Sequence, residues 1–195
     1  MDTLEQNEYQ DFQRTTLVKD TMLETFFVNE LKDIYGAENQ IIEALPRMHD
    51  AASSLKLQEA FDDHMQITYR QISRLEEVFD KLDMEAEAKD CEAMDGIIEE
   101  CETIIDETED DTATRDVGLV MAAQKVEHYE IASYGTLVQL ARTLGHDDIA
   151  EILKTTLNEE MEADRLLTEI AENDINYFAG EETDEEINDD DYEKY

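Results

Sequence analysis

Six side chains with metal-binding chemistry interrupt stripes that are otherwise apolar. They are five carboxylates and one imidazole, and the apolar residues around them recur at spacings of three and four, the period of a helix face. They are Glu38, His64, Glu127, Glu130, Glu160 and Asp164. An isolated buried carboxylate is costly, so a group of them inside a fold needs metal ions, protons or water. We therefore expect a metal site in the protein interior.

The donor types indicate which ions would bind. Oxygen donors with one imidazole suit iron or manganese better than they suit structural zinc, which favours sulfur. We expect two iron ions, with manganese as the alternative, and assign Glu130 and Glu160 as bridging ligands. The expected terminal ligands are Glu38, His64, Glu127 and Asp164. A redox-active centre of this kind would reduce oxygen or peroxide while oxidising Fe(II), a ferroxidase-like activity.

Other interpretations of the same residues stay open. In so acidic a chain, Glu127 and Glu130 could instead lie on the charged edge of their helix, beside its apolar face. His64 could be a core histidine hydrogen-bonded to a carboxylate. The inward carboxylates could also be protonated or hydrated in a metal-free helical dimer that acts as a scaffold.

Four long helices and one shorter helix must position these side chains. Helical apolar spacing covers about residues 20–48, 57–78, 113–144 and 148–171, with a shorter helical segment between 80 and 112. Pro46 should kink or end the last turn of the first helix. Gly145 is a natural stop for the third long helix.

The turns should bring the candidate ligands to one level. Residues equidistant from the turn of an antiparallel hairpin lie level, because each helix rises about 1.5 Å per residue. Glu38 and His64 are equidistant from the first predicted turn, and Glu130 and Glu160 from the second. Two such hairpins joined by a long connection predict an all-α, ferritin-like antiparallel four-helix bundle with an extra helix in the crossover.

The composition suits one domain with a flanking segment at each end. A chain of 195 residues with 41% hydrophobic residues can build a single core. We expect the bundle domain at residues 19–173, a mobile leader at 1–18 and an acidic, disordered tail at 174–195.

A formal net charge of -38 restricts the partners of the protein. DNA, RNA and anionic membrane surfaces would repel it, so we expect neither nucleic acid nor membrane as a partner. Periodic apolar residues show that the charge coats a core and does not mark disorder. We interpret it as adaptation to a salt-rich cytoplasm, where screening shortens the reach of repulsion to about 3 Å at 1 M. An ordinary acidic protein is the alternative.

The sequence also predicts a cytoplasmic location. The first residues, MDTLEQNEYQ, lack a basic region followed by an apolar stretch, and no segment approaches 18 apolar residues. Cys91 and Cys101 form neither a CxxC redox pair nor a zinc pattern. We therefore expect a soluble protein with reduced cysteines.

Five runs of residues carry a family resemblance. They are ELKDIYGAENQ at 30–40, ALPRMHDAA at 44–52, CEAMDGIIEE at 91–100, AAQKVEHYEIASYGTL at 122–137 and TLNEEMEAD at 156–164. These runs resemble the bacterial YciF stress-protein family of ferritin-like proteins over roughly residues 20–172. The resemblance implies a four-helix bundle with an added helix, a homodimer, a stress-linked role and similarity to rubrerythrin-type di-iron proteins.

The chain departs from the family pattern in its second long helix. In this helix the sequence pattern of the family resembles HxxET, whereas this chain reads HMQIT at 64–68. Ile67 therefore stands at the usual Glu position. The Glu-x-x-His pairs typical of ferritin-like dimetal sites are also absent. The sequence therefore leaves open whether the site holds two metal ions, one or none.

Overall fold

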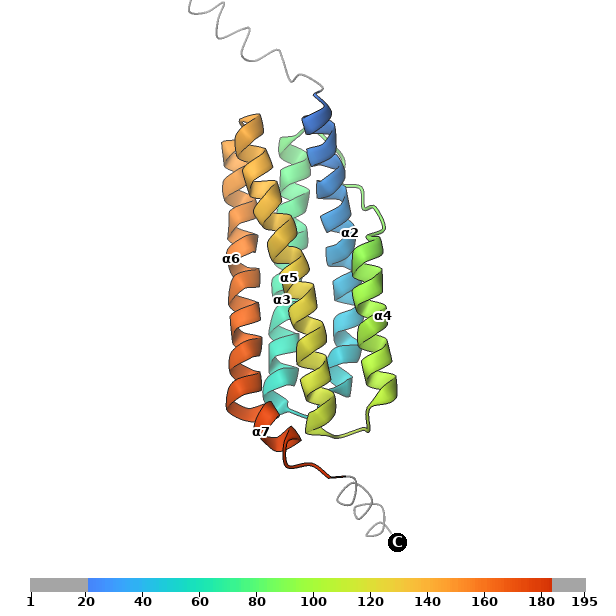
Figure 1. The fold of residues 1–195 in the computed structure, drawn as a ribbon. Helices are drawn as coiled ribbons and strands as arrows, with labels where there is room; N and C mark the ends of the chain where they lie inside the picture. Colours follow the sequence, from blue (N-terminus) through green and yellow to red (C-terminus); the bar gives the residue numbers. More distant parts are fainter. Residues whose placement is uncertain (1–20, 184–195) are drawn as a thin grey trace, which may run out of the picture.

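Residues 21–183 of the chain are described by the computed structural model. The four long helices are α2 (Met22–Ala51), α3 (Leu55–Lys81), α5 (Ala113–Leu144) and α6 (Asp147–Ile170). They run antiparallel in one bundle, while α4 (Glu92–Glu107) lies in the α3–α5 connection and packs on α5 and α2 (Figure 1). The predicted all-α bundle with a crossover helix is confirmed. Among residues 21–183, no helix has both the length and the apolar character that crossing a membrane requires.

Local chemistry sets several helix ends. The hydroxyl of Thr21 accepts a hydrogen bond from the Glu24 amide, and that of Thr112 accepts one from the Arg115 amide, both at 3.1 Å. Such side-chain acceptors satisfy amides that have no partner in the first turn of a helix. Gly145 adopts a left-handed φ of 87° and ends α5, as its sequence position predicted.

Pro46 does not end α2, contrary to one of the two outcomes predicted for it. The helix continues to Ala51, and Pro46 lies exposed on its surface. A proline removes one intrahelical hydrogen bond, and its ring here meets solvent. The end of the helix comes where the Ala52 amide bonds back to the carbonyls of Met48 and His49, both at 3.2 Å.

The core fills the space between the long helices. Their inward stripes supply large apolar side chains that are almost completely buried. Examples are Phe27, Leu31, Leu57, Val78, Leu119 and Ile149. Each such side chain contributes about 1.5–3 kcal/mol relative to exposure, and this burial fixes which face of each helix points inward.

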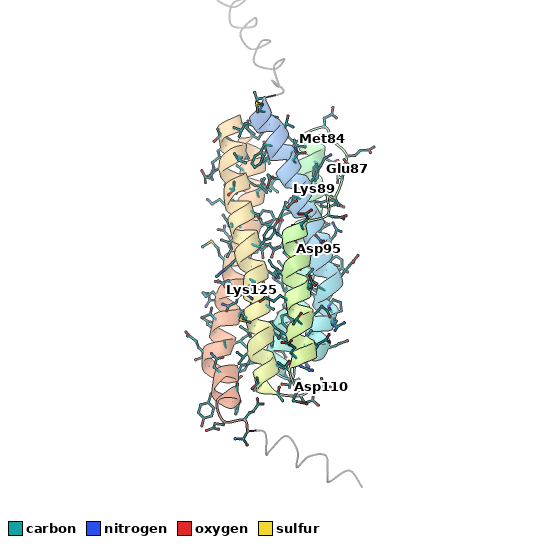
Figure 2. The ribbon with its side chains drawn as sticks, turned by 45° about the vertical axis from the view of Figure 1, so that its right-hand side comes forward. Met84, Glu87, Lys89, Asp95, Asp110 and Lys125 are labelled. Carbon is teal, nitrogen blue, oxygen red and sulfur yellow. The ribbon has the colours of Figure 1, made fainter. Side chains whose placement is uncertain are left out.

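The crossover chain is anchored on α2 by close backbone packing. A Cβ atom on Gly36 would lie 1.8 Å from the Lys89 carbonyl oxygen, so only glycine permits this approach. The Lys89 amide donates to the Lys32 carbonyl at 3.0 Å, and the Lys89 ammonium lies 2.8 Å from Asp33. Figure 2 shows Glu87 and Lys89 together on this connection, and Lys32 pairs with Glu87 at 2.5 Å.

The α2–α3 turn is anchored on the start of α5. The buried Asp116 carboxylate accepts hydrogen bonds from the Ser53 and Ser54 amides, each at 2.8 Å, and from the Ser53 hydroxyl at 2.7 Å. Ser54 precedes α3 and makes no capping bond with its own side chain, whereas Asp116 holds both serines from another helix through their own amides. This contact fixes the first hairpin against the second.

The helical chain extends beyond the predicted domain boundary at residue 173. A π-helical turn, η1 (Ala171–Ile175), and α7 (Asn176–Ala179) follow α6, and Ile175 is buried. The Glu182 carboxylate then accepts from the amides of Ala113 and Thr114 at 2.5 and 2.9 Å. The first part of the predicted tail therefore packs on the bundle. The predicted leader at 1–18 and residues 184–195 lie outside the described residues.

Candidate metal centre

Four buried side chains from three helices converge inside the bundle. His64 of α3, Glu127 and Glu130 of α5, and Glu160 of α6 each present one ligand atom, and these atoms all lie within 4.8 Å of one another. None of the four residues is more than 7% exposed. Donors that share an ion at about 2.0–2.2 Å lie at most about 4.4 Å apart, so the observed spacing is close to that of a metal site.

Glu38 lies beside this group. It is fully buried on α2 and accepts a hydrogen bond from the hydroxyl of Tyr134. Burial is the largest cause of the raised pKa of Glu130 and of Glu160, and the charge of Glu38 raises both pKa values further. Glu38 is not one of the four residues whose ligand atoms lie within 4.8 Å of one another, but its charge acts on that group from the remaining long helix.

Asp164 does not join the group. It is only half-buried, its Oδ1 accepts from Gln124 Nε2 at 3.2 Å, and the same oxygen lies 3.2 Å from Nε2 of the exposed His128. Four residues turn a helix through about 400°, so Asp164 is rotated about 40° from Glu160, towards the edge of the bundle. Its side chain is also one methylene shorter.

Every buried side-chain nitrogen or oxygen in residues 21–183 that lacks a hydrogen-bond partner belongs to the four clustered residues, to Glu38, or to Gln71, which contacts Glu160. These atoms are Glu38 Oε2, both ring nitrogens of His64, Gln71 Oε1, Glu127 Oε2, both carboxylate oxygens of Glu130 and Glu160 Oε2. An unpaired buried polar group costs about 1–3 kcal/mol, and more when charged. Their concentration at one place indicates that a ligand or bound protons compensate them.

Burial dominates the electrostatics of the cluster. It raises the pKa of Glu38 and of Glu127 to about 8. Burial, reinforced by the neighbouring carboxylates, raises the pKa of Glu130 and Glu160 well above their usual range. Burial lowers the pKa of His64 to about 4, so its ring is neutral near pH 7 and has a lone pair to donate.

Two side chains that were not predicted as site residues bind carboxylates here, Gln71 that of Glu160 in the cluster and Arg74 that of the neighbouring Glu159. The amide of the fully buried Gln71 donates to Glu160 and, at 3.3 Å, to Glu159. The Arg74 guanidinium grips both oxygens of Glu159 at 2.5 and 2.6 Å. Gln71 continues the inward stripe of α3, so a polar residue in that stripe was the available signal.

A protein family matches most of the chain. Residues 22–180 match the family described as Domain of unknown function (DUF892). Protein YciF of Escherichia coli (strain K12) is 44% identical over 155 residues, which cover 79% of this chain and 93% of that protein. The resemblance found in the sequence is therefore confirmed.

Solved structures support the fold. The crystal structure of the E. coli stress protein YciF matches with a TM-score of 0.76 and 43% identity, over 80% of this chain and 98% of that one. YcfI of Rhodopseudomonas palustris matches with a TM-score of 0.74 and 42% identity, over 78% and 97%. A Xanthomonas campestris protein shares the fold at 22% identity, with a TM-score of 0.63 over 82% and 97%.

Proposed function

This chain belongs to the YciF-type stress-protein family described as Domain of unknown function (DUF892), and from that premise we propose that its bundle holds a carboxylate-bridged metal centre. The metal is iron, with manganese as the alternative. The ligands are His64, Glu127, Glu130 and Glu160, with Glu38 beside them. The observation that carries the proposal is the concentration of unpartnered buried polar atoms in this one cluster.

Charge supports two ions over one. The neutral His64 adds no charge, whereas four glutamates carry four negative charges when ionised. Two divalent cations neutralise these charges, but a single divalent cation leaves two of them buried and uncompensated. Bound iron would supply one-electron chemistry towards oxygen or peroxide. The protein itself positions the carboxylates of Glu38 and Glu160 through hydrogen bonds from Tyr134 and Gln71.

Metal analysis tests the proposal. Full-length protein is reconstituted with Fe(II) without oxygen, freed of excess metal and analysed by plasma mass spectrometry. We expect about two ions per chain in the wild type and a loss of most of the metal in Glu130→Ala. Less than about a tenth of an ion per wild-type chain would end the proposal.

A metal-free scaffold is the second candidate function. The raised pKa values of Glu38 and Glu127, caused by burial, would let these carboxyls stay protonated without metal. Ile67, which has no donor atom, also favours this alternative. Under it, Glu130→Ala leaves the melting temperature equal or higher in the presence of Fe(II). Under the metal proposal, Fe(II) raises the melting temperature of the wild type and not of the variant.

We extend the proposal to the assembly: the protein acts as a homodimer, as the family resemblance implies. The chain has a mass of 22.5 kDa. Light scattering behind size exclusion should give twice this mass, and a monomer mass at micromolar concentration would contradict the dimer.

A further inference from the structure

A cavity of about 450 Å³ lies beside the candidate metal centre. It occupies the half of the bundle towards the α2–α3 turn, and its α2 wall runs from Ile41 to Met48. At about 1.5 Å per residue this wall is about 10 Å long. His64 and Glu127 line the cavity as well as the cluster, so the two spaces adjoin.

The cavity wall is mainly apolar and is built from residues of α2, α3, α4, α5 and α6. Its apolar side chains include Leu45, Phe61, Ile67, Ile98, Ala123 and Leu167. A volume of this size, apolar with a few polar groups, is typical of sites for small organic molecules. Ile67 places an apolar wall next to His64, where a carboxylate would instead have made the cavity polar.

The polar part of the wall is acidic. Asp63 and Glu162 lie exposed at its edge, and Glu102 and Glu159 are half-buried there. No lysine or arginine lines the cavity within the described residues. Glu159, Glu102 and Glu162 are already paired with Arg74, Arg47 and Arg165. An anionic ligand such as a fatty acid would therefore find no free cationic partner in the wall and would meet the charge of Asp63 at its edge.

At the inner end of the cavity, buried polar atoms lack a hydrogen-bond partner. Both ring nitrogens of His64 and the Oε2 atom of Glu127 are unpartnered, and these residues are only 7% and 3% exposed. A small uncharged polar group at this end would satisfy them. An apolar chain attached to that group would fill the remaining length.

We propose that this cavity binds a neutral amphiphile, an apolar chain with one hydroxyl-type head group at His64 and Glu127. Occupation of the cavity depends on the wall alone. The relation to metal rests on the proposed function: His64 and Glu127 would then be metal ligands, so the head group bonds to them in the metal-free protein and lies against the metal centre when ions are bound. The ligand class would then be an uncharged organic molecule and not a fatty acid.

Calorimetry on metal-free, full-length protein tests the proposal with 1-octanol and octanoate as probes. We expect 1-octanol to bind at least tenfold more tightly than octanoate. Ala123→Phe and Ala163→Leu should each weaken 1-octanol binding at least tenfold, because both alanines line the cavity. Ala132→Leu, at an exposed alanine of α5 outside the cavity, is the matched control and should bind as the wild type does.

Several results would overturn this proposal: no binding heat for 1-octanol, equal or tighter binding of octanoate, or unchanged binding in folded Ala123→Phe and Ala163→Leu. Circular dichroism establishes which variants are folded. Glu130→Gln separates the two proposals, because Glu130 belongs to the cluster but does not line the cavity. It should lose iron and keep 1-octanol binding.

Discussion

At the residue scale, protonation of the buried glutamates links the candidate centre to the stability of the fold. Each glutamate must either keep its proton or share a cation, since a lone buried carboxylate is costly. The bundle therefore holds either protons or metal ions at this place, and pH shifts the balance between them.

The stability of the metal-free protein should fall as pH rises from about 6.5 to about 8. Burial raises the pKa of Glu38 and of Glu127 from 4.5 to about 8, so the stability that they contribute is full below about 4.5 and is lost as pH rises to about 8; the interval above 6.5 covers the last part of this loss. His64, lowered by burial from 6.5 to about 4, acts in the opposite direction only below about 6.5. Thermal unfolding followed by circular dichroism with chelator should show a melting temperature lower by about 5 °C or more.

Saturating Fe(II) under nitrogen should remove this decline, because metal ions replace the protons. The double variant Glu38→Gln/Glu127→Gln is the control and should show a flatter profile without metal. A melting temperature of the metal-free wild type that rises over the same interval would contradict the prediction.

Asp164→Asn should retain the metal, whereas Glu160→Gln should lose most of it. Both residues lie on α6, but only Glu160 belongs to the buried group, and Asp164 faces Gln124 and His128. Iron content per chain after reconstitution measures the difference. A matching loss in Asp164→Asn would restore it to the ligand set.

The sequence could predict the inward positions of the site but not the reach of each side chain. Helical period and hairpin symmetry were enough to bring His64, Glu130 and Glu160 together, because both follow from backbone geometry alone. Asp164 lies outside the group because it is rotated by about 40° from Glu160 and its side chain is one methylene shorter. A pattern of inward-facing positions is too coarse to predict differences of this size. Gln71 was missed as a partner of Glu160 because its role depends on a contact between helices.

At the scale of elements, the crossover is positioned by backbone contact more than by its surface ion pairs. Lys32–Glu87 and Lys89–Asp33 are partly exposed, and such pairs contribute about 0–1 kcal/mol each. The approach of the Lys89 carbonyl to Gly36 leaves no space for a side chain. Figure 2 shows this segment leading directly into α4.

Gly36→Ala should therefore lower the free energy of unfolding by about 1–3 kcal/mol, the usual cost of overpacking. Gly135→Ala in α5 is the matched control, because a Cβ there meets no atom within 4 Å. It should instead stabilise the protein by about 0.5–1 kcal/mol through helix propensity. Urea titrations of both variants measure the difference, and a neutral or stabilising Gly36→Ala would refute the backbone-contact explanation.

Helix existence and helix ends differ in how far the sequence predicts them. Gly145 alone predicts a helix end, because glycine readily adopts a left-handed conformation, and α5 ends there as expected. The continuation past residue 173 could not be predicted locally, because Ile175 and Glu182 are held by contacts with distant parts of the bundle. The same holds for Asp116, which anchors the turn before α3 from the start of α5.

At the scale of the whole molecule, basic residues are too few to neutralise the acids. The chain has 53 acidic residues and 15 lysines and arginines. Most basic residues of the described part, ten of them, already pair with acids. The remaining acids repel one another across a bundle whose helices must stay closely packed, so folding works against this repulsion.

Adaptation to a salt-rich cytoplasm predicts that the fold depends on KCl. Between 0.1 and 1 M salt the screening length falls from about 10 to about 3 Å, shorter than the spacing between helices, so most of the gain should come in this range. Helix content and melting temperature followed by circular dichroism should both rise with KCl, and then level off. Sucrose at equal osmolality is the control and should reproduce only a small part of the rise, since it does not screen charge. Full helix content and an unchanged melting temperature without added salt would show that the core alone outweighs the repulsion, and the protein would then be an ordinary acidic one.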